Sequence, residues 1–194
     1  MANIENIIEK QSNVKSLLIE IGEIARDTKK EVYAVGGVVR DLLLDKEIKE
    51  IDLMVIGDGI EFAKILADKL GIPKIVPFPK YSTAHIPAKP IPIEVAAARE
   101  EIYSSESRKP AKVKYTDLMG DLIRRDFTIN AMALSIAPEN FGDLHDPYNG
   151  IKDLKEKKLI TPLDPNKTFS EDPLRMMRAA YFASKLDLKI EKNC

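Results

Sequence analysis

The stretch that decides the fold is YAVGGVVRDLLL (Tyr33–Leu44), which is followed shortly by EIDLMV (Glu50–Val55). The apolar residues before the glycine pair predict a short buried strand, and those after it return to helical spacing. Gly36 and Gly37 let main-chain N–H groups approach a ligand closely where the helix begins, and the helix dipole favours an anion there. Arg40, one turn into the helix, adds a charged fork for phosphate groups. The segment therefore predicts a strand, a glycine turn that binds a triphosphate, and a helix.

Two acidic residues open the second strand of this stretch. Glu50 and Asp52 are separated by one residue, so both side chains emerge on the same face of the strand. Two carboxylates on one face, close to a phosphate-binding turn, predict a magnesium site of the two-metal type.

Each of these signals also has a plainer explanation. A glycine pair is often only a turn, an acidic pair is often only a solvated face, and Arg40 and Asp41 can form a surface ion pair. The stretch has neither the G-x-x-x-x-G-K-[ST] pattern of a P-loop nor the G-x-G-x-x-G pattern of a dinucleotide-binding fold. The order of strand, glycine pair, helix and acidic strand favours the functional interpretation.

Outward from this stretch, the pattern of apolar residues predicts alternating helices and strands. Helices are predicted over residues 3–26, 59–70, 118–123, 151–157 and 172–186. Strands are predicted over residues 75–76, 83–86, 91–98, 129–136 and 142–145, and the first two are expected to be short or at a sheet edge because they lie among prolines. Residues 102–114 are polar and basic, so we expect a mobile loop that can close over phosphate.

A second group of functional side chains lies in RRDFTINAMA (Arg124–Ala133). Arg124 and Arg125 supply charge, Asp126 supplies a carboxylate and Asn130 an amide, which together can hold the phosphates and ribose of a nucleotide. The plainer alternative is a helix end with an asparagine that completes a turn. Without the other motifs we would prefer that alternative.

A third group lies in SEDPLRMMRAAYF (Ser170–Phe182). Ser170 is a good N-cap, which would make the acids that follow it ordinary partners of the helix dipole. Arg175 and Arg178, three and six residues after Asp172, are not explained in that way. An aspartate acceptor beside an arginine donor can hydrogen-bond the Watson–Crick edge of a base, so this group predicts a choice of the incoming nucleotide.

Composition excludes several other classes of protein. The 194 residues carry 30 basic and 31 acidic side chains, which disfavours a strongly basic protein that coats nucleic acid. The single cysteine, Cys194, excludes a disulfide framework. No segment approaches the length of apolar sequence that crosses a membrane and no signal peptide is evident, so we expect a cytoplasmic protein with no membrane partner.

Five motifs in order resemble the catalytic head of the class II tRNA nucleotidyltransferases, which include the CCA-adding enzymes and the bacterial poly(A) polymerases. The resemblance extends from about Tyr33 to Leu186. It rests on YAVGGVVRDLLL, EIDLMV, RRDFTINAMA, DPYNGIKDL (146–154) and EDPLRMMRAAYFASKL (171–186). The family implies an α+β fold, with a mixed nucleotidyltransferase sheet of five strands, helices on one side of it, and the start of a helical neck.

The resemblance also implies a role for each candidate residue. It implies two Mg²⁺ ions at Glu50 and Asp52, with a weaker match for Glu94 as a third ligand, and a flexible loop at residues 102–114 that helps to switch from C to A addition. The implied partners are ATP, CTP and the 3′ end of tRNA. The residues implied to contact the nucleotide bind its triphosphate (Gly36, Gly37, Arg40, Arg124, Arg125), its ribose (Asp126, Asn130) and its base (Asp172, Arg175, Arg178).

Two residues depart from the family pattern. Glu50 stands where an aspartate is usual, and its extra methylene moves the carboxylate by more than about an ångström, to which metal sites are sensitive. Tyr181 stands where arginine is common. A non-catalytic module that binds nucleotide or RNA, and a poly(A) polymerase that acts on other RNA, are therefore the alternatives to a tRNA nucleotidyltransferase.

The motif map divides the chain into three parts. We expect an N-terminal helix that packs on the head (residues 1–30), the nucleotidyltransferase head (31–165), and the start of a truncated helical neck (166–194). Such a head is expected to bind nucleotide but to be weakly active, because the family grips tRNA with helical regions that follow the head.

Overall fold

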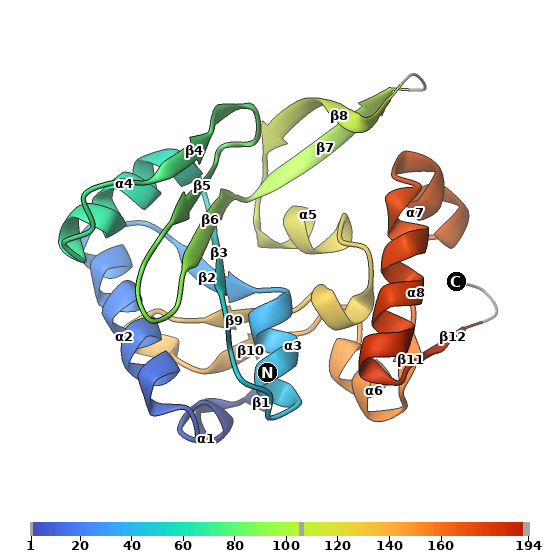
Figure 1. Cartoon of the computed structure of the whole chain (residues 1–194), viewed down its shortest axis with the longest axis horizontal. Helices are drawn as coiled ribbons and strands as arrows, with labels where there is room; N and C mark the ends of the chain where they lie inside the picture. Colours follow the sequence, from blue (N-terminus) through green and yellow to red (C-terminus); the bar gives the residue numbers. More distant parts are fainter. Residues whose placement is uncertain (1, 105–106, 192–194) are drawn as a thin grey trace.

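A mixed sheet forms the centre of the molecule. The computed structural model (Figure 1) describes residues 2–104 and 107–191, and the side chains of all of these except residues 101–113. Eight strands pair in the order β1-β10-β9-β2-β3-β6-β5-β4. They are β1 (Ala2–Asn3), β2 (Val32–Val35), β3 (Ile51–Val55), β4 (Val76–Phe78), β5 (Thr83–Ile86), β6 (Ile93–Ala97), β9 (Ala133–Ser135) and β10 (Asp143–His145). β3 and β6 run parallel, whereas the other neighbours are antiparallel.

Two smaller pairs of strands lie outside this sheet. The antiparallel hairpin of β7 (Arg99–Ser104) and β8 (Ser107–Tyr115) directly follows β6 and extends away from the sheet (Figure 1). The two-residue strands β11 (Lys158–Leu159) and β12 (Lys189–Ile190) pair in parallel.

Helices cover the two faces of the sheet unequally. They are α1 (Glu5–Ile8), α2 (Ser12–Asp27), α3 (Gly37–Leu43), α4 (Gly59–Lys69), α5 (Leu118–Ile123), α6 (Gly150–Lys155), α7 (Pro165–Glu171) and α8 (Leu174–Leu186), with 3-10 turns at Pro79–Tyr81, Thr128–Asn130 and Pro138–Asn140. Figure 1 shows α2 and α4 on one side of the sheet, and α5 and α8 on the other. The larger apolar core contains buried residues of α2 and α4 and extends to Ala179 and Phe182 of α8, and a smaller cluster around Met54 and Leu122 lies beneath α5.

The alternation of side chains along β3 places the acidic residues on the less covered face. Ile51 and Leu53 point into the larger core, so Asp52 and Met54 point the other way. Asp52 is in register with Glu94 on β6, which brings the two carboxylates together on that face. The mixed α+β fold that the resemblance implies is present, with three short outer strands, β1, β10 and β4, beside the central five, and with helices on both sides of the sheet rather than on one.

Four predictions of local structure are wrong in part. The helix predicted over residues 3–26 is broken between α1 and α2, because five polar residues separate Ile8 from the next buried apolar residue, Val14. Residues 129–136 are strand only over β9, since Thr128 is held in a 3-10 turn by bonds from its hydroxyl to Asp153 and from its N–H to Ile160.

The other two corrections concern loops and helix ends. The segment 102–114, predicted as a loop, belongs to the β7–β8 hairpin, apart from residues 105–106, which lie outside the described residues. Ser170 is not an N-cap: it lies in the last turn of α7, and the carboxylate of Asp172 accepts the N–H of Leu174 at the start of α8 instead. The described residues contain no helix that is long and apolar enough to cross a membrane.

Candidate functional site

Most of the predicted site residues line one cavity of about 640 Å³, which lies between the sheet, α3, α5 and α8. Twelve of the thirteen predicted site residues line it: Gly36, Gly37, Arg40, Asp52, Glu94, Arg124, Arg125, Asp126, Asn130, Asp172, Arg175 and Arg178. Glu50 lies at its edge, in an adjoining cavity of about 420 Å³ that shares Gly37, Arg40 and Asp52. The structure therefore brings together residues that are up to 142 positions apart in the sequence.

Three carboxylates form one side of the cavity. Glu50, Asp52 and Glu94 each offer an oxygen that lies within 4.8 Å of the other two. Burial, together with the charges of Glu50 and Glu94, raises the pKa of Asp52 to about 7. Burial and the charge of Glu50 also raise the pKa of Glu94. Ionising all three carboxylates is unfavourable unless a cation lies among them. A set of oxygen donors of this kind suits a hard divalent cation.

The glycine turn fits closely between the acids and the arginines. Gly36 has a φ of +68°, and a Cβ there would lie 2.7 Å from Nη1 of Arg125. A Cβ at Gly37 would lie 3.7 Å from Oδ2 of Asp52. The N–H of Gly36 donates to the carbonyl of Met132, so Gly36 contributes its backbone conformation and its lack of a side chain rather than a free amide.

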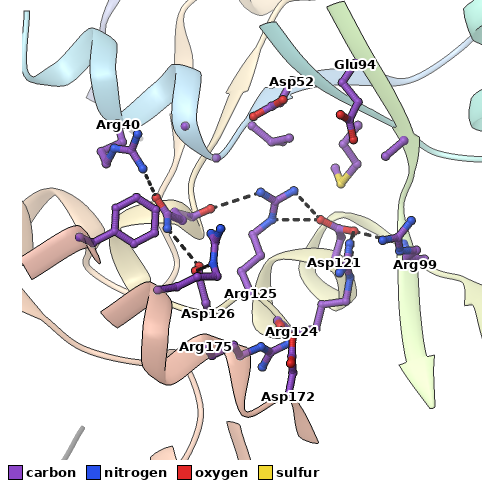
Figure 2. Close-up of a pocket in the computed structure, with 18 of the residues that line it drawn as sticks. Arg40, Asp52, Glu94, Arg99, Asp121, Arg124, Arg125, Asp126, Asp172 and Arg175 are labelled. Carbon is purple, nitrogen blue, oxygen red and sulfur yellow. Dashed lines mark hydrogen bonds and ion pairs between the residues drawn. The ribbon is translucent and has the colours of Figure 1, made fainter. Parts of the chain in front are cut away.

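Two arginines on the opposite side of the cavity share one buried carboxylate. Arg124 donates from Nε and Nη2 to Oδ1 of Asp121, at 3.2 and 2.6 Å. Arg125 donates from Nε and Nη2 to Oδ2 of the same group, at 3.1 and 2.8 Å. Figure 2 shows Asp52 and Glu94 together on one side, with Asp121 and its arginines facing them.

The charge of Asp121 is stabilised in this position. Its side chain is only 1% exposed. Burial alone would raise its pKa, but the charges of Arg125 and Arg124 and their hydrogen bonds outweigh that effect, so the pKa is lowered. Asp121 is therefore ionised at neutral pH.

A second chain of polar contacts connects α8 with α3. Arg178 donates to Oδ2 of Asp126 at 2.6 Å, and Asn130 donates to Oδ1 of Asp126 at 3.0 Å. Arg40 in turn donates to the amide oxygen of Asn130 at 2.6 Å. The ring of Phe182 lies between the two arginines, 5.0 Å from Arg40 and 5.1 Å from Arg178, in positions that favour cation–π attraction.

The predicted base-reading pair lies at the start of α8. Arg175 is buried and donates to the carbonyl oxygens of Thr168, at 3.4 Å, and Arg124, at 2.8 Å. The side chain of Asp172 accepts the N–H of Leu174 at 3.1 Å. Both side chains line the cavity, and the main-chain contacts fix their positions.

Sequence reasoning missed four residues that line the cavity. These are Arg99, Asp121, Phe182 and Lys185. A signal existed for Asp121: it stands three and four residues before Arg124 and Arg125, which is the spacing of ion pairs on a helix. Arg99, at the start of β7, donates to the carbonyl of Tyr81 at 2.8 Å, a contact that the sequence does not reveal.

Comparison with known proteins agrees with this arrangement. Residues 32–160 match the family described as the poly A polymerase head domain. The A-adding tRNA nucleotidyltransferase of Aquifex aeolicus is 47% identical over 161 residues, which are 83% of this chain and 19% of that protein. This chain therefore spans about a fifth of the length of that relative.

Two solved structures are similar over almost the whole chain. A structure described as a CCA-adding enzyme, apo form II, has a TM-score of 0.86 at 34% identity, with 98% of this chain and 45% of that one covered. The Thermotoga maritima CCA-adding enzyme complexed with tRNA has a TM-score of 0.81 at 32% identity, with 98% and 43% covered. With the motifs, the sheet and the cavity in agreement with the family match, this chain belongs to the poly A polymerase head domain family, the head of the class II tRNA nucleotidyltransferases.

Proposed function

We propose that this chain is the catalytic head of an RNA nucleotidyltransferase, which adds CMP, AMP or both to the 3′ end of tRNA without a nucleic-acid template. The observation that carries the proposal is a carboxylate triad that faces two arginines across one cavity. A nucleoside triphosphate in that cavity meets acids for its metal ions and cations for its phosphates. The proposed partners are ATP, CTP and tRNA, and the proposed location is the cytoplasm, where these three meet.

The metal ions are proposed to be two Mg²⁺ held by the three carboxylates. Glu50, Asp52 and Glu94 supply only oxygen ligands, which match the preference of Mg²⁺. When bound, such ions increase the acidity of the RNA 3′-hydroxyl and offset the charge that develops on the α-phosphate. The reach of Glu50 toward the other two carboxylates supports its role as a ligand, despite its departure from the usual aspartate.

The arginine side is proposed to bind the phosphates. In the reaction, the 3′ oxygen bonds to the α-phosphorus, the bond to the β-phosphate oxygen breaks, pyrophosphate leaves and the hydroxyl proton passes to water. Arg40, Arg124 and Arg125, together with the close approach permitted by Gly36 and Gly37, stabilise the negative charge on the leaving group.

The remaining site residues are proposed to position the nucleoside. Asp126 and Asn130 lie beside Arg40 and are assigned to the ribose. Asp172, Arg175 and Arg178 line the cavity from the start of α8, and we assign them to the edge of the base. Because their positions are fixed by main-chain and ion-pair contacts, these side chains can act as a rigid template.

The domain division is proposed to follow the same function. Residues 1–30 contribute α1 and α2, which pack on the head, residues 31–165 form the head, and residues 166–194 begin the neck. The contacts of α2 with β2 and α4 support the first assignment.

The decisive experiment is incorporation of labelled CTP and ATP by this chain. Three tRNA substrates are compared, ending at the discriminator base, after the first C and after the second C, with Mg²⁺ present or chelated. We expect nucleotide incorporation on at least one of them, only with the metal, and the pattern identifies CCA, CC or A addition. An unstructured RNA of equal length is the control, because equal use of it would favour a poly(A) polymerase.

A calorimetric titration separates the enzyme from a module that only binds. CTP and ATP are titrated into the protein with and without Mg²⁺ under the conditions of the incorporation assay. Tight nucleotide binding without turnover on any RNA would contradict the proposed enzyme and favour the non-catalytic alternative.

A further inference from the structure

We propose that Asp121 is a positioning residue of the nucleotide site, which holds Arg124 and Arg125 in the orientation that receives the triphosphate. The inference rests on the proposed function, because it assumes that these arginines face phosphate. It adds a residue that acts through its hydrogen bonds to protein groups, chiefly the two guanidinium groups.

The geometry of the shared carboxylate carries the proposal. Each oxygen of Asp121 receives the Nε and Nη2 of a different arginine, so one carboxylate fixes two planar forks side by side. In a fork held through Nε and Nη2, Nη1 is the end farther from Asp121. For Arg125, Nη1 donates to the carbonyl of Asn130 at 3.3 Å and lies beside the turn at Gly36, so this arginine is fixed at both ends.

The same carboxylate also fixes the surroundings of the arginines. Oδ1 of Asp121 accepts the main-chain N–H of Arg99 at 3.3 Å, where the β7–β8 hairpin leaves the sheet. The carbonyl of Arg124 accepts Nη2 of Arg175 at 2.8 Å, which extends the connection to α8. Asp121 thus joins the root of the hairpin, the phosphate side and the base side of the cavity.

A purely electrostatic role predicts the opposite effect on binding. Asp121 brings one negative charge to the arginine side of the cavity, so its removal should strengthen the attraction for an anion if charge alone matters. If Asp121 instead positions the arginines, its removal releases two long side chains that must be ordered again on binding. The second effect weakens triphosphate binding by about tenfold. The sign of the change therefore distinguishes the two roles.

The test is the substitution Asp121→Asn, with binding of ATP, inorganic tripolyphosphate and adenosine measured by calorimetry. We expect about tenfold weaker binding of both polyphosphate ligands and less than about twofold change for adenosine, because Arg124 and Arg125 are assigned to the phosphates alone. The matched control is Asp117→Asn on the same helix, where asparagine preserves the N-cap bond to Gly120. Unchanged or tighter polyphosphate binding by Asp121→Asn would overturn the proposal, as would an equal loss for adenosine.

A second measurement needs no variant and no nucleotide. In the unaltered chain, the Nε–H groups of Arg124 and Arg125 should give resolved NMR signals at neutral pH that exchange slowly with solvent, because both are bonded to a buried carboxylate. Fast exchange of these protons would overturn the positioning role even if the Asn variant failed to fold. If the unaltered chain binds no nucleotide, the proposed function fails, whereas slow exchange would still support the fixed orientation of the arginines.

Discussion

Two aspartates on opposite sides of the same cavity have opposite electrostatic environments. Asp52 is surrounded by Glu50 and Glu94, and its pKa is raised to about 7 by burial and by these like charges. Asp121 is more deeply buried, but it is bonded to Arg124 and Arg125, and its pKa is lowered. Burial alone therefore does not determine the role of an acidic residue. Asp52 faces like charges that a metal ion can neutralise, and Asp121 is already paired with two arginines.

The difference arises from secondary structure. Along strands, a residue two positions away and a partner in register on the next strand share a face, so β3 and β6 bring acidic side chains together. Along a helix, the residues three and four positions later share a face, so α5 provides Asp121 with two arginines.

The largest effect is expected from removing the acid that lacks a cation. Asp52→Ala should lower nucleotide incorporation by at least about 10²–10³-fold. The site loses a ligand for the metal ions that are proposed to offset the charge on the α-phosphate. The melting temperature at neutral pH should not fall, since the substitution also removes like-charge repulsion from the triad. Incorporation at the rate of the unaltered chain would contradict the assignment of the triad.

A third aspartate of the cavity extends the comparison to the base. Asp172→Ala should reduce the preference for CTP and ATP over GTP and UTP by about tenfold, which is the value of one hydrogen bond to a base edge. Affinity for tripolyphosphate should change little, because Asp172 is assigned to the base rather than to the phosphates. A preference that stays unchanged in competition assays with all four nucleotides would refute its role as a template residue.

Sequence reasoning found the residues whose spacing along the chain is itself a signal more readily than those that depend on contacts between separate elements. The spacing of Glu50 and Asp52 on a strand is a local signal, and the glycine turn is another. The assignment of Glu94 to the same cluster was weaker because it depends on the register between β3 and β6, which the sequence does not contain. The contact of Arg99 with Tyr81 likewise depends on how the start of β7 meets the 3-10 turn Pro79–Tyr81.

Other errors came from local signals that competed with tertiary contacts. Ser170 and Pro173 fit the start of a helix, but the chain ends α7 at Glu171 and begins α8 at Leu174, so Asp172 occupies the junction between two helices. That junction places Asp172 at the cavity. A local cap signal cannot reveal this, because the break is stabilised partly by the bond from Arg175 to the carbonyl of Arg124.

A smaller effect is expected where the arginine side meets the glycine turn. Gly36→Ala places a Cβ at a φ of +68°, which should lower the free energy of unfolding by about 1–2 kcal/mol, and it also displaces Nη1 of Arg125. Gly71→Ala is a matched control, because Gly71 has the same φ of +68° and nothing within 4 Å of its Cβ position. Both variants should lose similar stability in denaturant unfolding, but only Gly36→Ala should lose affinity for ATP. Equal ATP affinities of the two variants would contradict the assignment of Arg125 to the phosphates.

The smallest expected effect compares the two aspartates by their pH dependence. Between about pH 4 and pH 7 the folded chain keeps a proton on Asp52 that the unfolded chain has lost, so stability without metal should fall as pH rises through this interval. Asp121, with its lowered pKa, acts in the opposite direction and only below its ordinary value near 3.8, where stability is lost as pH falls. A scan from pH 5 to pH 8 in EDTA therefore reports on the acid side, and the melting temperature should fall by several degrees more in the unaltered chain than in Asp52→Asn. Since a divalent cation binds the ionised carboxylates, added Mg²⁺ should raise the melting temperature at pH 8 and have little effect at pH 5. Equal shifts at both pH values would contradict the link between the raised pKa of Asp52 and metal binding.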